Sequence, residues 1–124
     1  MRGLAVLLLS MACGCVGDGG EDSLTGALTL EAAFDPDPPV VGRNTLTVWV
    51  TASGAPIDDA TVTVDPQMPA HGHGSTEDPV VEGRGDGRYD AFPVTFQMPG
   101  TWVVTVTALA AQGSGQRALE VQVE

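Results

Sequence analysis

The sequence predicts an all-β fold, an antiparallel β-sandwich of about seven strands. From Ala27 onward, short β-branched runs alternate with glycine, proline and aspartate at intervals of about ten residues, a spacing typical of sandwiches. No helical period of convincing length interrupts these runs. The chain has 124 residues, which is enough for one domain. A second domain is not expected, because a single core usually takes about 100 residues to bury its apolar surface well.

Three strands are expected in the first half of the chain. Residues 27–34 form the first one, ahead of the proline-rich break at 36–39. In 45–51, leucine and valine alternate with threonine and tryptophan, so one face of this strand turns toward the core. Residues 61–64 repeat the pattern. The glycine, proline and aspartate of 53–59 predict a compact loop that links these two strands as adjacent segments.

The second half supplies the remaining strands. Residues 88–96 and 101–109 are two of them, and a short piece lies near 80–81. The segment 97–100 joins the first two through a proline, which fixes one turn position, and a glycine, which permits positive φ. It therefore predicts a hairpin. Residues 116–123 form the final strand.

Two further features are given structural interpretations. Trp49 and Trp102 are expected between the two sheets, since large aromatic residues in sandwiches more often fill the core than bind ligands. Residues 84–86 match the cell-adhesion tripeptide Arg-Gly-Asp, but an Asp-Gly step continues into Gly87. That step, directly before a strand, predicts a turn.

The N-terminal residues predict export. Arg2 supplies a short positive region and 4–9 an apolar run, after which small residues and cysteine follow at once. The run is far shorter than the roughly 20 residues needed to cross a bilayer, which argues against a permanent transmembrane helix. The segment resembles the lipobox of bacterial lipoproteins, in which a small residue precedes the cysteine that is acylated. Cys15 fits this role slightly better than Cys13, and both remain candidates.

Both cysteines lie at this junction, so none remains in the body of the chain for a disulfide, a zinc cluster or a nucleophile. A disulfide between the two would be strained by their closeness. We therefore expect a lipoprotein signal peptide over 1–14, a flexible acidic and glycine-rich tether over 15–26, and the sandwich over 27–124. The implied location is the cell envelope, with a lipid anchor on the periplasmic or outer surface of a membrane.

The charge balance excludes one class of partner. The chain has 16 acidic residues against 5 basic ones, a net charge of −11, so its field repels nucleic acid. Catalysis is not expected either. The sequence has no recognisable serine, histidine and acid order, no cysteine nucleophile in the body and no phosphate-binding glycine loop of the strand-to-helix kind.

Four short segments then point to a family. Residues 42–48, 68–74, 87–89 and 96–102, in this order and spacing, resemble the YtkA-like domain family, with FixH-like proteins as more distant relatives. The resemblance spans roughly 40–106. It implies an immunoglobulin-like sandwich exposed outside the cytoplasm, in a neighbourhood of proteins of copper handling and respiratory-oxidase maturation. It implies no settled activity.

One group of residues could bind a metal. Both histidines, His71 and His73, lie just after Met68 and beside adaptable glycines. Two imidazoles two residues apart on an extended segment point to the same side, and the thioether of Met68 could close on the same ion. Met98 is a candidate fourth ligand, and nitrogen with sulfur donors suits copper. Alternatively, both methionines close the core and both histidines are polar loop residues.

Two functions therefore remain open. One is a membrane-anchored extracytoplasmic accessory that handles copper through the Met-Pro-x-His-x-His loop at 68–73. The other is a metal-free interaction module that docks a partner protein in an envelope or oxidase-assembly complex. Convergence of the Met68 sulfur and the two imidazoles on one open point would favour copper. Methionines buried inward, with imidazoles splayed into solvent, would favour the module.

Overall fold

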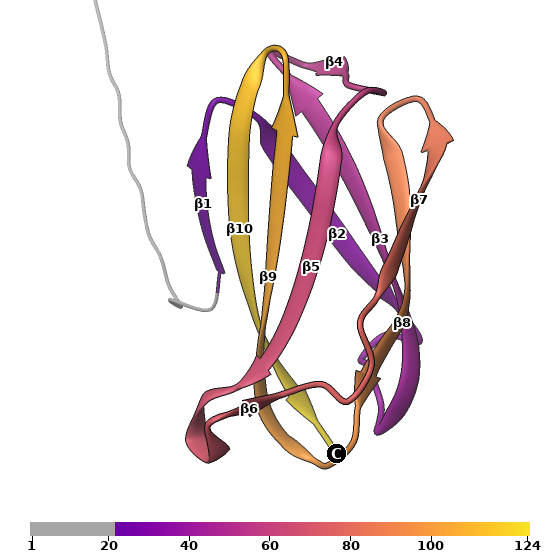
Figure 1. Cartoon of the computed structure of the whole chain (residues 1–124), viewed down its shortest axis with the longest axis vertical. Coiled ribbons are helices and arrows are strands. Elements are labelled where there is room, and N and C mark those ends of the chain that lie inside the picture. Colours follow the sequence, from indigo (N-terminus) through magenta and orange to yellow (C-terminus); the bar gives the residue numbers. More distant parts are fainter. Residues whose placement is uncertain (1–21) are drawn as a thin grey trace, which may run out of the picture.

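The computed structural model describes residues 22–124, which form two antiparallel sheets packed face to face (Figure 1). The β9 sheet has the strand order β1-β10-β9-β5-β6, and the β3 sheet has the order β2-β3-β8-β7 with β4 added on β3. The elements are β1 (Asp22–Gly26), β2 (Thr29–Asp35), β3 (Gly42–Ala52), β4 (Ala55–Pro56), β5 (Thr61–Met68), the 3-10 turn η1 (Pro69–His71), β6 (His73–Gly74), β7 (Val80–Gly85), β8 (Arg88–Phe96), β9 (Gly100–Ala110) and β10 (Gly113–Val123).

The predicted all-β sandwich is confirmed. The structure has more strands than expected because it includes some very short ones. In the described part of the chain, seven strands have six residues or more, which matches the expected number. The additional strands, β1, β4 and β6, have five, two and two residues. Such short strands leave little alternation in the sequence by which they could be recognised.

The core lies between the inner faces of the central strands. Along β9 and β3, alternate residues are buried and their neighbours are half-exposed or exposed. Trp102 is fully buried, and the centroid of its ring lies 5.0 Å from that of Phe96. Each fully buried valine or leucine stabilises the fold by about 1.5 to 3 kcal/mol relative to its exposed state. The inward residues of the two central strands are Leu46, Val48 and Val50 on β3 and Trp102, Val104, Val106 and Ala108 on β9.

The prediction for the two tryptophans is confirmed for Trp102, which is fully buried, and wrong for Trp49, which is 38% exposed. Trp49 lies between the inward-facing Val48 and Val50 on β3, so its side chain points to the opposite face. It pairs with Arg88 of β8 on the outer surface of the β3 sheet. The period of two along a strand thus outweighs the general tendency of tryptophan to be buried.

The connection at residues 97–99 is not the predicted hairpin. It joins β8, a strand of the β3 sheet, to β9, a strand of the β9 sheet, and so crosses from one layer to the other. Two of the antiparallel hairpins with short turns are β9–β10 and β7–β8. In the second of these, Asp86 and Gly87 both have positive φ, at 55° and 77°, so the interpretation of this Asp-Gly step as a turn is confirmed.

The sandwich also begins earlier than expected. Residues 22–26, which we assigned to the flexible tether, form β1 and pair antiparallel with β10 from Asp22↔Leu119 to Gly26↔Gly115. A strand pairs with a sheet edge through its backbone groups, so it needs no apolar pattern. The sequence of residues 22–26 therefore does not indicate a strand. The expected signal peptide and both candidate lipidation sites, Cys15 and Cys13, lie outside the described residues. Among the described residues, no helix is long and apolar enough to span a membrane.

Candidate metal site

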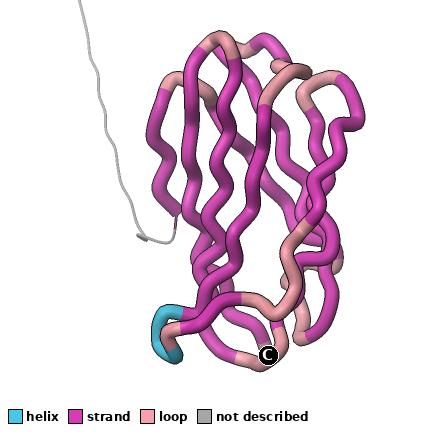
Figure 2. Tube along the Cα trace, viewed as in Figure 1, coloured by secondary structure: helices cyan, strands magenta, loops and turns pink. Residues whose placement is uncertain are grey.

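Both histidines lie on a small projecting loop at one end of the sandwich. β5 ends at Met68, η1 follows, and β6 folds back on β5 with the pairs Gln67↔Gly74 and Met68↔His73. Figure 2 shows η1 as the cyan turn at the end of the molecule near the C-terminus. The β8–β9 connection reaches the same end (Figure 1).

The local sequence explains the tight shape of this loop. Pro69 occupies the first turn of η1, where its fixed φ and missing N–H cost nothing. Gly72 closes η1 in the left-handed conformation, with φ 69°, and its N–H donates to the carbonyls of Met68 and Pro69. The histidines are therefore not on an extended segment, and the expectation that extended geometry aligns them is wrong.

The two imidazoles nevertheless lie side by side. The ring centroids of His71 and His73 are 5.8 Å apart, with the planes tilted by 45°. Two imidazoles that share one ion have centroids about 5 to 6 Å apart, because each donor nitrogen lies about 2 Å from the metal. His71 is exposed and His73 is half-buried, so the pair opens to solvent.

The ring of His73 is held by contacts with other elements. Its Nδ1 lies 3.0 Å from the carbonyl oxygen of Gly74. The side-chain amide of Gln97, from the β8–β9 connection, donates to the same carbonyl at 2.9 Å. Trp102 of β9 meets the imidazole edge-on, with centroids 5.9 Å apart. The indole N–H of Trp102 donates in turn to the carbonyl of Met98 at 3.0 Å.

The methionines are placed differently from the histidines. Met68 is 2% exposed and belongs to the core, and its terminal methyl fills the space that a Cβ at Gly100 would occupy. Met98 is half-buried and packs against the core. The structure therefore brings His71 and His73 together, while both thioethers lie against apolar neighbours. The placement of the methionines therefore agrees with the alternative interpretation, in which both methionines close the core.

Acidic side chains near the loop have partners of their own. Glu77 accepts hydrogen bonds from Arg43 at 2.6 Å and from Thr95 at 2.5 Å. These hydrogen bonds, with that from Arg43 the strongest, lower the pKa of Glu77 against the opposing effect of burial. Within residues 22–124, no group of three or more histidine, cysteine, aspartate or glutamate side chains could hold a metal ion. A metal at the histidines would thus depend on the two imidazoles and on ligands of another kind.

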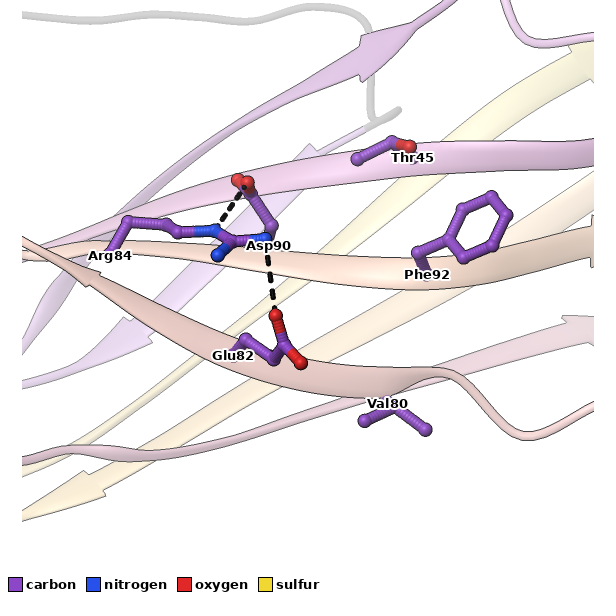
Figure 3. Close-up of a pocket in the computed structure, with 6 residues that line it drawn as sticks. All are labelled: Thr45, Val80, Glu82, Arg84, Asp90 and Phe92. Carbon is purple, nitrogen blue, oxygen red and sulfur yellow. Dashed lines mark hydrogen bonds and ion pairs between the residues drawn. The ribbon is translucent and has the colours of Figure 1, made fainter.

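A second candidate surface lies on the outer face of the β3 sheet (Figure 3). A shallow hollow of about 320 Å³ is lined by side chains of β3, β7 and β8. Val80 and Phe92, at 62% and 48% exposure, form its apolar part, and Trp49 is exposed on the same face. This surface is not among the sites expected from the sequence, although the period of two in β3 and β8 places these side chains on one face. The lining residues are Thr45, Val80, Glu82, Arg84, Asp90 and Phe92.

The charged groups of this outer surface are paired with each other. Asp90 accepts hydrogen bonds from Arg84 at 3.0 Å, Arg88 at 3.2 Å and Thr47 at 3.0 Å. Burial raises the pKa of Asp90, but these hydrogen bonds together outweigh burial and hold the pKa below its ordinary value. Arg84 also reaches Glu82 at 3.1 Å. The cluster therefore stabilises the sheet surface, and its charges are already compensated.

Fold and loop together define a small antiparallel β-sandwich that presents a pair of histidines at one end. The family model described as YtkA-like matches residues 26–107, and the chain belongs to this family. The matched region runs from the end of β1 into β9 and includes both histidines. The resemblance drawn from the four sequence segments is thus confirmed. Comparisons with curated proteins and with solved structures found no match.

Proposed function

We propose that this chain is an extracytoplasmic copper-binding accessory domain, which holds copper(II) between His71 and His73. The observation that carries the proposal is the pair of imidazoles, 5.8 Å apart on an open loop. Imidazole suits copper, and copper(II) has the highest affinity of the divalent first-row metals for such sites. Two protein nitrogens leave coordination positions open, which suits a domain that passes its metal to another protein. The proposal includes no catalytic step.

The proposed location rests on the N-terminal sequence. A short apolar run followed by small residues and cysteine supports export and acylation of Cys15, or of Cys13. A lipid anchor there would tether the sandwich to a membrane of the cell envelope. Membership of the YtkA-like family, whose resemblance implies exposure outside the cytoplasm, adds to this support.

The methionines have a secondary part in the proposal. Met68 packs in the core at 2% exposure, where it anchors the start of the loop. The proposal does not require its sulfur as a copper ligand. Met98 is half-buried in the β8–β9 connection and is the less buried of the two thioethers. A sulfur donor would favour copper(I), so the oxidation state depends on whether Met98 joins the imidazoles.

Fluorescence of Trp102 tests the copper proposal, because Trp102 lies 5.9 Å from His73 and copper(II) quenches nearby indoles. The protein carries Trp49→Phe, which leaves Trp102 as the single tryptophan, and Cys13→Ser with Cys15→Ser, which removes competing thiols. Copper(II) should quench the emission. The added pair His71→Ala/His73→Ala should weaken binding at least tenfold, or about 1.4 kcal/mol. Equal quenching with and without the histidines would exclude the proposal.

A second candidate function is the metal-free interaction module, now attached to a specific surface. Trp49, Val80 and Phe92 are exposed on three adjacent strands of the β3 sheet. Aromatic residues are enriched where proteins bind each other, and an envelope protein is the proposed partner. A photo-crosslinking residue at position 92 should capture that partner in cells. The same residue at position 63, which is exposed on β5 in the other sheet, should not. Equal yields at both positions would count against this surface.

A further inference from the structure

We propose that Gln97 is a positioning residue for His73. With the carbonyl of Gly74, it holds the proton of the neutral imidazole on Nδ1 and leaves Nε2 as the nitrogen that faces a metal. The second half of this statement rests on the proposed copper function. The first half concerns the metal-free protein, and so it can be tested separately.

The carbonyl of Gly74 decides which ring nitrogen carries the proton. Nδ1 of His73 lies 3.0 Å from this oxygen, which is hydrogen-bond distance. A carbonyl oxygen can only accept a hydrogen bond, and one nitrogen of a neutral imidazole is a donor while the other is an acceptor. A hydrogen bond across this contact therefore makes Nδ1 the donor. The remaining nitrogen, Nε2, keeps its lone pair, and a lone pair is what a metal binds.

The distances around Gln97 fit this assignment better than the opposite one. Its amide nitrogen donates to the Gly74 carbonyl at 2.9 Å but lies 3.4 Å from Nδ1 of His73. If Nδ1 accepted from Gln97 instead, it would face the Gly74 oxygen at 3.0 Å with no proton between them, which is repulsive. Because the Gly74 oxygen has two lone pairs, it accommodates both donors at the shorter distances.

The position of Gln97 in the fold gives this contact its structural effect. Gln97 lies in the connection that crosses from β8 to β9, whereas Gly74 ends the short strand β6. The hydrogen bond therefore fixes the end of the projecting loop to the body of the sandwich. Trp102, bonded to Met98 of the same connection, contacts the imidazole edge-on. The ring of His73 is thus set by Gln97 of this connection, through the Gly74 carbonyl, and by Trp102 of β9.

Outer partners of this kind commonly matter to metal sites. A ligating histidine usually donates its other N–H to a carbonyl or carboxylate, which fixes its tautomer and orientation, and loss of such a partner costs about 10- to 100-fold in affinity. Gln97 is exposed, so we expect the lower end of this range, about tenfold for copper(II).

NMR of the ring nitrogens tests the tautomer in the full chain without metal. The protein is ¹⁵N-labelled, carries Cys13→Ser and Cys15→Ser, and is kept at mildly alkaline pH. His73 should show its proton on Nδ1. Gln97→Leu, which keeps bulk but removes the donor, should release the Gly74 carbonyl from the β8–β9 connection, so that this carbonyl holds the Nδ1 proton less well and the population shifts toward the Nε2–H form that free histidine prefers. Gln112→Leu, an exposed change in the turn between β9 and β10, should leave the tautomer as it was.

The outcomes separate the two proposals. A proton on Nε2 of His73 in the parent protein, or a tautomer that Gln97→Leu leaves unchanged, would overturn the role of Gln97. Equal copper(II) affinity in Gln97→Leu and the parent would overturn its effect on the metal and leave the copper function standing. Failure of the parent to bind copper(II) would overturn the proposed function, while the tautomer shift would still support Gln97 as the residue that orients His73.

Discussion

At the scale of single residues, Asn44 shows how this sandwich accommodates a polar group in its interior. Asn44 is 1% exposed and lies where the pairing of β3 with β8 shifts register. Its amide accepts from the Val40 N–H at 2.9 Å and donates to the carbonyls of Val40 at 2.9 Å and Val94 at 3.2 Å. One side chain thus supplies hydrogen-bond partners for the backbone of the preceding loop and for a carbonyl of β8 beside the irregularity.

We predict that Asn44→Ala lowers the free energy of unfolding by about 2 to 3 kcal/mol, because buried backbone groups lose their partners. Urea denaturation measures this change. The neighbouring substitution Thr45→Ala, on the half-exposed outer face of β3, should cost under about 1 kcal/mol. Equal losses from the two substitutions would show that the Asn44 amide does not stabilise the irregularity.

The lowered pKa values of two carboxylates, Glu77 and Asp90, indicate how the stability of the fold depends on pH. The pKa values of Glu77 and Asp90 are below their ordinary values of 4.5 and 3.8. A carboxylate with a depressed pKa stabilises the fold above its ordinary pKa, and this contribution is lost as the pH falls toward the folded value. The urea concentration at the midpoint of unfolding should therefore decrease as the pH is lowered below about 4.5. It should fall less steeply in Glu77→Gln/Asp90→Asn, and identical pH profiles would contradict the assignment.

At the scale of elements, the turn of the β7–β8 hairpin packs against the C-terminal end of β3, where the Val50 N–H donates to the carbonyl of Gly87. Gly87 has φ 77°, and a Cβ at this position would lie 2.7 Å from the carbonyl oxygen of Val50. Gly54 has a similar φ of 83°, but a Cβ there would meet nothing within 4 Å. The two glycines thus share a backbone conformation and differ in the space around them.

Comparing Gly87→Ala with Gly54→Ala separates these two effects. Each should cost about 1 to 2 kcal/mol for the left-handed conformation. Gly87→Ala should cost more, because the new methyl cannot move away from a backbone oxygen. Urea unfolding of the two variants gives the difference directly, and equal losses would mean that the hairpin turn shifts to make room.

Elements also show how far sequence reasoning reaches. The strand expected at 88–96 matches β8, because alternation and turn residues are local signals. The sheet that each strand joins is not local. The proline and glycine at 97–100 indicate a reversal of the chain, but whether it forms a hairpin or crosses between layers depends on packing over the whole core. The imidazoles were expected to lie on one side of an extended segment, but a 3-10 turn brings them together instead. The contact of Gln97 with Gly74 depends on that crossing, and no local pattern signals it.

At the scale of the whole molecule, negative charge dominates the surface. The net charge is −11. Each of the four arginines in residues 22–124 lies within ion-pair distance of an acidic residue. The remaining carboxylates repel one another, and self-repulsion opposes the compact state. The pairs are Arg43–Glu77, Arg84–Glu82, Arg84–Asp90, Arg88–Asp90 and Arg117–Glu31.

Added sodium chloride should therefore stabilise the protein. An increase from about 0.01 M to 0.15 M shortens the screening length from about 30 Å to about 8 Å, which weakens repulsion across the surface more than it weakens close ion pairs. The thermal midpoint, measured by circular dichroism, should rise over this range. A fall would mean that the ion pairs contribute more than the repulsion removes.

The pairing of β1 with β10 has a consequence for biosynthesis. The first and last described strands are neighbours in the β9 sheet, so this sheet cannot close until β10 has left the ribosome. β9, which lies between β10 and β5, also comes late in the chain. A nascent chain therefore lacks a completed β9 sheet until β10, residues 113–123, has been synthesised.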